Sequence, residues 1–509
     1  MSLTSLAFFG FFLGTLILYY LIPVKFRYLV LLAASVAFFL LSSTPYTGLY
    51  LLADILVTAL CARGMTEEAP AGRKKGLLAV GLVVNLGILA VLKYSHFFAD
   101  NLAALVNLFG ANLSFELPEL LSPLGISFYT LTAVGYLLDC YWGLVEPEKN
   151  PLKTALFISY YPALTSGPIM KWREMKDQLF TEHRFSYENL TGGLQRMLWG
   201  LFKKLVLSVR LATVVNTVYG DLETYQGLYV WVAAGLFMLQ LYTDFSGCMD
   251  IILGAGECYG IRAPENFRQP FFSRSVQEFW QRWHITLGGW LKEYILYPVL
   301  RSRLFSKMTK AIKNKFGRKA SRQIPSYLGM LIVWLAVGLW HGGDWKYVLG
   351  MGLWYFMLIA LSSALTPVFK KVNAFLHVKE DSFSWHLFQS LRVFLLVSFG
   401  NVFFRLDSVA ETFTAYKAMF STFNPWIFFN GGLLNLGLTN WDLNVLTFGL
   451  LLLLAVSCLA EKYGTARAWL KEQGVVFRYF VWLSLLLLVV IFGAYGPGFD
   501  ATDFIYKGF

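Results

Sequence analysis

The stretch YFVWLSLLLLVVIFGAYGP, residues 479–497, decides the class of fold. It carries no charged side chain, and its length matches the ~20 mostly apolar residues that a helix needs to cross the hydrocarbon core of a bilayer. A helix that is hydrophobic on every side is stable only inside a protein core or in lipid. The stretch therefore predicts a membrane-spanning helix.

The same signal recurs along the whole chain. Hydrophobic residues make up 57% of the 509 residues and charged residues only 15%, which leaves too little polar surface for a soluble globule. We expect an all-α, polytopic integral membrane protein with about 11–13 transmembrane helices. The predicted spans are about 6–23, 28–43, 47–62, 76–93, 120–139, 199–218, 227–243, 326–342, 346–365, 387–404, 442–460 and 479–497.

Positive charge is concentrated in residues 301–322, which hold nine Lys or Arg and no acid. The formal net charge of +12 does not indicate nucleic-acid binding, because no signature of such a fold accompanies it. Basic loops beside spans lie mostly in the cytoplasm. Placing this cluster and the other basic loops there puts both termini outside the cytoplasm, provided that residues 157–170 enter the membrane and return.

Residues 157–170 form a poor continuous helix, since Pro162, Gly167 and Pro168 interrupt them. Irregular backbone at membrane depth is tolerated where it is buried in protein or lines a wet cavity. The segment is either a re-entrant element near a site or a kinked ordinary span.

Apolar residues recur at steps of three and four between Val276 and Tyr294, which predicts an amphipathic helix at the bilayer surface or dipping into it. On its flank, Gln277, Gln281, His284 and Gly288 would form a polar row. Such a row could form the wall of a cavity.

Two histidines follow tryptophans in polar stretches of this apolar chain, His284 in QRWHITL and His341 in GLWHGGDW. Imidazole takes and returns a proton near neutral pH, and an ionisable group at membrane depth is costly unless it is used. Counted from Ile324, ~17 residues at ~1.5 Å each would carry His341 ~25 Å across the bilayer, away from the cytoplasm. The alternatives are a helix-capping role for His341 and an interfacial belt role for His284.

Asp244 follows an apolar span and is either a buried acid or a helix-end residue that faces water; the sequence names no partner for it. The five cysteines lack CxxC spacing and are best explained as small buried side chains. Walker A, HExxH, GxSxG and dinucleotide motifs are absent, which removes support for metal, nucleotide-hydrolysis and serine-hydrolase chemistry.

At these residues the chain resembles the membrane-bound O-acyltransferase family, in its bacterial branch of alginate O-acetyltransferases and teichoic acid D-alanyltransferases. The matching motifs are LGISFYT (124–130), SGPI (166–169), DFSG (244–247), PENF (264–267), EFWQRWHITL (278–287), GLWHG (338–342), FFR (403–405) and the terminal FIYKGF (504–509). They follow the family order along the whole chain.

The resemblance implies one membrane domain over 1–509, with N-terminal helices in 1–143, a catalytic core in 144–347 and C-terminal helices in 348–509. Its fold would be a ring of helices with a thin centre, reached by funnels from both faces. It implies His341 as the catalytic histidine and His284 as the second histidine of the polar core. Further candidates for the substrate and donor tunnel are Asp244, Ser246, Asn266, Arg282, Trp283 and Trp340.

The implied reaction moves an acyl group, most consistently acetyl, from a cytoplasmic thioester to a hydroxyl of an extracytoplasmic cell-surface polysaccharide. The donor would be acetyl-CoA or a phosphopantetheine carrier protein, with no metal and no permanently bound cofactor. Transfer would be direct or through an extracytoplasmic partner, of SGNH type or another acyl acceptor, in a bacterial cell membrane. The alternatives are D-alanyl transfer to teichoic acid, a transporter of an acylated carrier and a scaffold for polysaccharide export.

Overall fold

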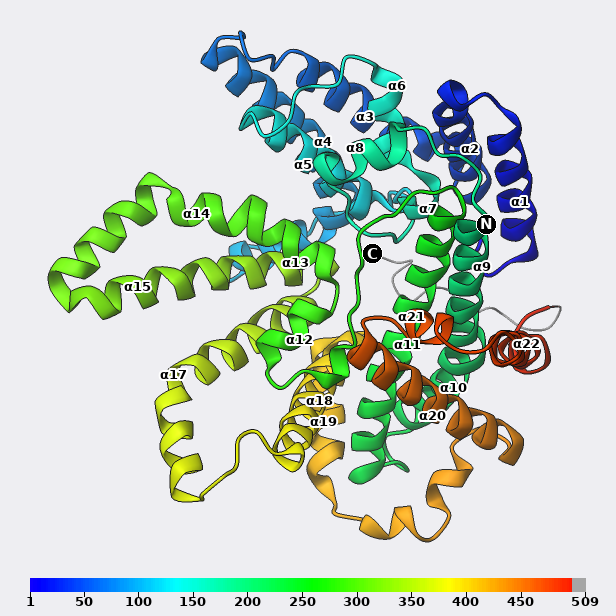
Figure 1. Cartoon of the computed structure of the whole chain (residues 1–509). Coiled ribbons are helices and arrows are strands. Elements are labelled where there is room, and N and C mark those ends of the chain that lie inside the picture. The colour runs from blue at the N-terminus through cyan, green and yellow to red at the C-terminus, as the bar shows by residue number, and fades with distance from the viewer. Residues whose placement is uncertain (497–509) are drawn as a thin grey trace. The chain divides into compact units, whose positions relative to one another are not determined.

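A computed structural model describes residues 1–496, so the FIYKGF motif lies outside the described residues. Within residues 1–496 the regular structure is helical and contains no strand, only an isolated bridge between Phe267 and Trp283. Figure 1 shows the course of the helices, which group into two compact units. The first contains Met1–Phe202 and Phe245–Glu265 with the residues from Tyr495; the second contains Lys203–Asp244 and Asn266–Ala494.

The first unit consists mainly of N-terminal helices, in which α2 packs against α1 and α6, and α3 packs against α4, α5 and α6. Side-chain oxygens of Ser5, Asn150 and Ser186 accept hydrogen bonds from first-turn N–H groups and so fix where α1, α6 and α9 begin. The helices are α1 (Leu6–Leu21), α2 (Arg27–Ser42), α3 (Gly48–Arg63), α4 (Ala71–Asn107), α5 (Ile126–Tyr141), α6 (Pro151–Ser159), α7 (Tyr161–Leu164), α8 (Trp172–Phe180) and α9 (Tyr187–Leu201), with short 3₁₀ turns at Val24–Phe26 and Pro45–Thr47.

The second unit holds most of the remaining helices. They are α10 (Val209–Gly220), α11 (Leu228–Cys258, which continues into the first unit), α12 (Val276–Arg282), α13 (Ile285–Leu291), α14 (Tyr297–Arg301), α15 (Arg303–His341), α16 (Trp345–Tyr347), α17 (Trp354–Phe375), α18 (Phe383–Arg405), α19 (Val409–Ser421), α20 (Asn440–Tyr463), α21 (Ala466–Lys471) and α22 (Val475–Phe492). Three π-helical segments interrupt them, η3 (Phe202–Ser208), η5 (Lys292–Leu296) and η6 (Val348–Leu353), and 3₁₀ turns lie at Pro270–Phe272, Pro425–Phe428 and Gly432–Asn435.

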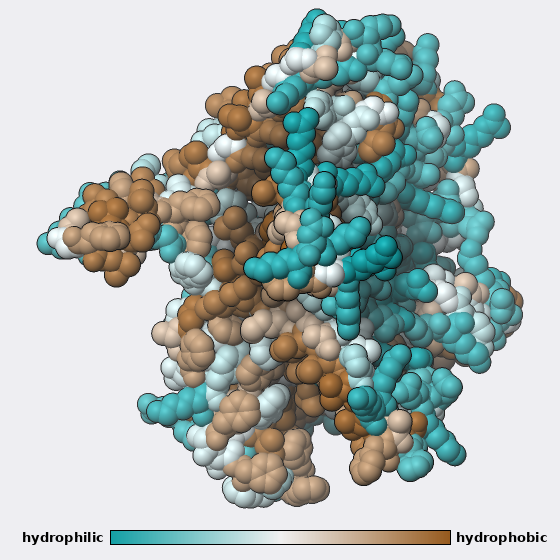
Figure 2. All heavy atoms as spheres, turned by 90° about the vertical axis from the view of Figure 1, so that its left-hand side faces the viewer, coloured by the Kyte–Doolittle hydropathy of each residue, from teal (hydrophilic) through white to brown (hydrophobic). Residues whose placement is uncertain are grey.

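Nine helices in the described part of the chain are long and apolar enough to span a membrane. They are Val24–Ser42, Pro45–Arg63, Ala71–Asn107, Leu228–Cys258, Arg303–His341, Trp345–Phe375, Phe383–Arg405, Asn440–Tyr463 and Val475–Phe492. Many large apolar side chains on them are exposed, and Figure 2 shows hydrophobic residues gathered over a broad part of one face. Apolar surface of that extent needs lipid or another apolar partner. The prediction of a polytopic all-α membrane protein is confirmed.

The other three predicted spans are helical but shorter or interrupted. The predicted span 6–23 corresponds to α1, and 120–139 to α5, which begins only after Gly125. Gly125 has φ +76°, and a Cβ there would lie 1.9 Å from the carbonyl oxygen of Leu164. The predicted span 199–218 is divided by the π-helical segment η3 between α9 and α10.

Residues 157–170 are broken as their composition predicts. Helix α6 ends at Ser159, the one-turn helix α7 follows, and the chain from Thr165 to Lys171 is irregular. Nearly every residue of this segment is buried within the first unit. It is therefore an interrupted element enclosed by protein, the setting in which irregular backbone at membrane depth is stable.

The basic stretch 301–322 lies at the turn of a hairpin in the second unit (Figure 1). The helical path breaks at Ser302 and again at Gly317, which has φ +81°. Beyond these breaks α15 returns along the preceding segment, and Leu300 packs against Gly329. The apolar half of α15 then leads to His341.

Candidate active site

His341 is the last residue of α15 and is almost completely buried. Its Nδ1 lies 2.8 Å from the carbonyl oxygen of Val337, one turn earlier. A carbonyl only accepts, so Nδ1 must carry the proton and donate. In the neutral ring Nε2 then holds the lone pair, which makes Nε2 the basic atom. This contact selects the tautomer that the sequence leaves open.

Aromatic rings enclose His341. The ring centroid of Trp340 lies 4.9 Å from that of His341, and Phe404 from α18 lies 6.0 Å away. Gly342 follows directly, and a Cβ at Gly342 would lie 2.4 Å from the ring of Tyr347. The glycine after His341 therefore permits close packing of this aromatic ring.

His284 does not lie within a helix, so the predicted continuous amphipathic helix is wrong. Helix α12 ends at Arg282, α13 begins at Ile285, and His284 between them has φ +48° and ψ +50°. This left-handed conformation is unfavourable for a residue with a Cβ and often marks a functional site. The polar row of Gln277, Gln281, His284 and Gly288 assumed one helix, and the break removes its regular spacing.

The PENF motif forms this break. Phe267 pairs with Trp283 in the isolated bridge, where the N–H of Arg268 donates to the carbonyl of Arg282. Next to the bridge the N–H of Ile285 donates to the carbonyl of Asn266 at 3.0 Å. An extended, strand-like pairing thus replaces the helical hydrogen bonds on both sides of His284.

The side chain of Asn266 is fully buried beneath His284. Its Oδ1 accepts from the N–H of Thr286 at 3.0 Å and from the hydroxyl of Thr286 at 2.8 Å. The Nδ1 of His284 lies 3.4 Å from the same oxygen. Asn266 therefore joins the first turn of α13 to the imidazole.

The two histidines influence each other electrostatically. Burial lowers the pKa of His284 well below its usual value, and the proximity of His341 lowers it further. The Trp340 ring packs on both imidazoles, with a centroid distance of 5.5 Å to His284. His284 is therefore neutral near pH 7, beside a second imidazole that has its Nδ1 protonated.

Asp244 is buried, and Lys204 from η3 forms an ion pair with it. The hydroxyl of Ser208 lies 3.5 Å from the same carboxylate oxygen. The neighbouring Lys203 is also buried, with its ammonium 5.7 Å from the ring centroid of Tyr242. Asp244 is therefore a buried acid and not a helix-end residue that faces water. Lys204 lies in the π-helical segment η3, and π-helical turns are frequent at functional sites.

The other candidates occupy different positions. Arg282 binds Glu461 of α20 through Nη1 at 2.8 Å and Glu278 through Nη2 at 2.8 Å, so its guanidinium ties helices together. Trp283 is buried in an aromatic cluster and stacks on Phe279. Ser246 is buried on α11 within the first unit.

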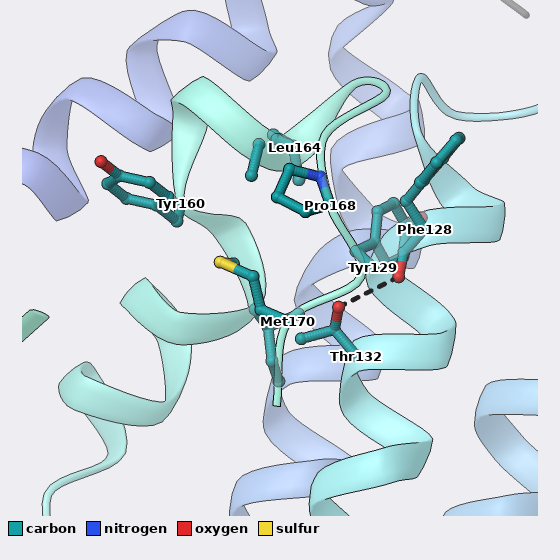
Figure 3. Close-up of a pocket in the computed structure, with 9 residues that line it drawn as sticks. Phe128, Tyr129, Thr132, Tyr160, Leu164, Pro168 and Met170 are labelled. Atoms are coloured by element: carbon teal, nitrogen blue, oxygen red, sulfur yellow. Dashed lines mark hydrogen bonds between the residues drawn. The ribbon is translucent and has the colours of Figure 1, made fainter. Parts of the chain in front are cut away.

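Two further matching motifs line a small pocket in the first unit (Figure 3). Phe128, Tyr129 and Thr132 of α5 lie on one side, and Tyr160 and Met170 of the interrupted segment lie on the other. The pocket has room for about one water molecule. Within residues 1–496 the buried hydroxyls of Tyr129 and Tyr160 have no hydrogen-bond partner, and an ordered water in the pocket would supply one.

Lys204 and Phe404 were not predicted from the sequence. The sequence does contain a signal for Lys204, since two adjacent lysines interrupt an otherwise apolar run. A charged side chain at membrane depth needs a partner of opposite charge, so this pair could have pointed to a buried acid. Phe404 lies in the FFR motif, but only the tertiary packing brings it to His341. Within residues 1–496, no group of three His, Cys, Asp or Glu side chains is arranged to hold a metal ion.

Comparison with known proteins identifies a family. Residues 147–312 match the model of the membrane-bound O-acyltransferase family. The chain is 30% identical over 412 residues to a probable alginate O-acetylase of Azotobacter vinelandii, covering 80% of this chain and 75% of the relative. It is 29% identical to a peptidoglycan O-acetyltransferase of Helicobacter pylori, covering 76% and 73%. A teichoic acid D-alanyltransferase of Bacillus subtilis is 29% identical over 47% of this chain and 59% of its own length.

Proposed function

This chain belongs to the membrane-bound O-acyltransferase family, and from that premise we propose that it acetylates hydroxyl groups of an extracytoplasmic cell-surface polysaccharide. The acetyl group is favoured because the alginate and peptidoglycan relatives align over about three quarters or more of this chain, whereas the D-alanyl relative aligns over about half. D-Alanyl transfer to teichoic acid is the second candidate.

The observation that carries the chemistry is the contact between His341 and Val337. With Nδ1–H donated to the carbonyl, Nε2 is the atom that takes the proton of the acceptor hydroxyl. The hydroxyl oxygen attacks the thioester carbonyl carbon and a new C–O bond forms. When the C–S bond breaks, the leaving thiolate receives the proton from the His341 imidazolium. The products are an ester and a free thiol.

A thioester is already activated, so the protein has to supply a base and alignment. A positioned base contributes ~10²–10⁴-fold, and orientation of the two substrates contributes more. Trp340 and Phe404 exclude water around the imidazole, which favours acyl transfer over hydrolysis. The donor, acetyl-CoA or a phosphopantetheine carrier protein, is used as a substrate in this scheme.

The basic hairpin indicates how the protein is oriented across the membrane. The stretch 301–322 would face the cytoplasm, where a thioester donor is made, in a multi-pass protein of the bacterial inner membrane. The 19 residue steps from Arg322 to His341 rise ~28 Å as a helix, close to the ~30 Å hydrocarbon core. His341 would then meet an extracytoplasmic glycan, or a partner protein that accepts the acyl group first. Both termini would lie outside the cytoplasm.

A deletion strain complemented with variants tests this function. His341→Ala should abolish surface acetyl esters, measured by mass analysis of the polymers, while the protein still inserts at normal abundance. His386→Ala is the matched control, because His386 also follows a tryptophan but lies in the first turn of α18. Ester content that is unchanged in His341→Ala would contradict the proposal, and loss of D-alanine instead of acetate would select the second candidate.

Transport of an acylated carrier makes a different prediction. Purified protein in liposomes would then move the carrier without forming a new ester. Transfer of labelled acetyl from acetyl-CoA to a soluble glycan by the detergent-solubilised protein, where no compartments exist, would exclude it.

A further inference from the structure

The break between α12 and α13 costs conformational free energy, which the contacts around it must offset. His284 holds a left-handed backbone conformation, which costs of order 1–3 kcal/mol for a residue other than glycine. The bridge between Phe267 and Trp283 holds the N-terminal side of the break. On the C-terminal side, the backbone carbonyl of Asn266 accepts from Ile285 and its side-chain oxygen accepts from Thr286. Asn266 thus fixes the chain on the C-terminal side of His284.

We propose that Asn266 is a positioning residue, which holds His284 in this break and keeps the imidazole proton on Nδ1. The proposal gives His284 a defined role in substrate binding. It depends on the proposed function for its catalytic consequence, although its structural consequence can be measured without any activity.

The hydrogen bonds decide which end of the Asn266 amide faces the histidine. The N–H of Thr286 can only donate, so the atom that it contacts must be the amide oxygen. Rotating the amide would place its NH₂ group against this N–H donor and lose the hydrogen bond of 3.0 Å, whereas the Thr286 hydroxyl, which can donate or accept, does not discriminate between the two orientations. The oxygen is thereby locked toward Nδ1 of His284, and an oxygen acceptor requires a protonated Nδ1.

Both imidazoles then have the same tautomer. His341 donates Nδ1–H to Val337 and His284 donates Nδ1–H to Asn266, so each neutral ring accepts through Nε2. His341 acts as the base on the acceptor hydroxyl. His284 can bind a second O–H or N–H group of the substrates, but it cannot donate from Nε2 while it is neutral. We infer that His284 recognises a hydrogen-bond donor on the bound substrate.

Nitrogen NMR of the full chain in lipid, with ¹⁵N-labelled histidine, tests the tautomer directly. The chain has six histidines, and His284→Asn identifies the resonances of His284. Asparagine tolerates left-handed backbone, so this variant preserves the break. The expected spectrum shows His284 with a protonated Nδ1 and an unprotonated Nε2. Protonation at Nε2 in the unmodified protein would overturn the proposal, and this measurement needs no Asn266 variant to fold.

Three variants test whether Asn266 is the cause. Asn266→Leu removes the acceptor, so His284 should populate both tautomers; Asn266→Asp keeps an oxygen there and should retain Nδ1–H. Asn424→Leu is the matched control, because Asn424 is also buried and also ties two segments together, through the N–H of Leu228 and the carbonyl of Gln226. An unchanged His284 spectrum in a folded Asn266→Leu protein would contradict the assignment.

Kinetics with acetyl-CoA as the donor probe extend the test to catalysis. Asn266→Leu should lower kcat at least tenfold, and Asn266→Asp should restore activity with the acid limb of its pH profile moved to higher pH, since a carboxylate favours the imidazolium. Identical pH profiles for Asn266→Asp and the unmodified protein would count against the positioning role. If the unmodified protein transfers no acetyl group, the proposed function fails while the tautomer assignment still stands on its spectrum.

Discussion

The Nδ1 atom of His341 lies 2.8 Å from the carbonyl oxygen of Val337, one helical turn earlier in α15. Val337 lies four residues before the end of α15, so the imidazole folds back along its own helix and contacts this carbonyl in addition to the helical hydrogen bond. The contact holds the proton on Nδ1 and leaves Nε2 as the basic atom. A structural contact of His341 and a catalytic role are compatible, because they use different nitrogen atoms.

His341→Gln should lower the rate of acetyl transfer by ~10²–10⁴-fold, because a glutamine amide cannot take a proton at neutral pH. Steady-state release of free CoA from acetyl-CoA, with a glycan acceptor present, measures the loss. Binding of the donor should change little, so the effect should fall on kcat. His386→Gln serves as the control, and a His341→Gln enzyme within tenfold of the unmodified rate would refute the base assignment.

Lys204→Met should destabilise the protein strongly, by about 3–5 kcal/mol, because it leaves the Asp244 carboxylate buried opposite an apolar group. The double variant Lys204→Met with Asp244→Leu should recover much of this loss, since neither charge remains. Thermal unfolding in detergent measures both. Equal melting temperatures for the single and double variants would show that the pair is not energetically coupled.

Glu461→Gln should have a much smaller effect than Lys204→Met. The Arg282–Glu461 pair is partly exposed, with 18% and 34% of the two side chains accessible, and such pairs contribute about 0–1 kcal/mol. Arg282 also retains Glu278 as a partner. The melting temperature should therefore change by only a few degrees, and a fall as large as that of Lys204→Met would mean that α20 depends on this contact.

Nine of the twelve predicted spans coincide, within residues 1–496, with helices long and apolar enough to cross a membrane, because that signal is local. The two histidines singled out from the sequence are both buried and share contacts with Trp340. Apolar runs such as 442–460 identify helices directly, and a histidine in such a setting stands out. The same local logic failed between Val276 and Tyr294. The apolar residues there have helical spacing. Trp283 nevertheless pairs with Phe267, sixteen residues earlier, and this pairing interrupts the helix.

The partner of Asp244 was unpredictable for a similar reason. Lys204 lies forty residues earlier in sequence, and the π-helical turn η3 changes which side chains share a face. A regular helix through 199–218, as predicted, would have given a different register. The spacing of apolar residues in the sequence therefore cannot predict contacts between distant segments or a local change in the number of residues per helical turn.

The low pKa of His284 makes stability depend on pH. A buried imidazole whose pKa is depressed binds fewer protons when folded than when unfolded, so its contribution is fully present above pH 6.5 and is lost as the pH falls below that value. The melting temperature should thus decline from pH 7 to pH 5, and His284→Asn should show a shallower decline. Parallel curves for the two proteins would rule out His284 as a source of the acid sensitivity.

Gly338 and Gly288 form a matched pair that tests the packing around the histidines. A Cβ at Gly338 would lie 2.7 Å from the carbonyl oxygen of Tyr347, whereas a Cβ at Gly288 would meet nothing nearer than 3.8 Å. Gly338→Ala must therefore push α15 away from the Tyr347 backbone and move His341, one turn later, at a cost of about 1–3 kcal/mol. Gly288→Ala should be neutral or slightly stabilising, because alanine favours the helix. Melting temperature and acetyl transfer should both fall in Gly338→Ala alone; a loss of transfer in Gly288→Ala with an unchanged melting temperature would instead mean that substrate approaches α13 at that glycine.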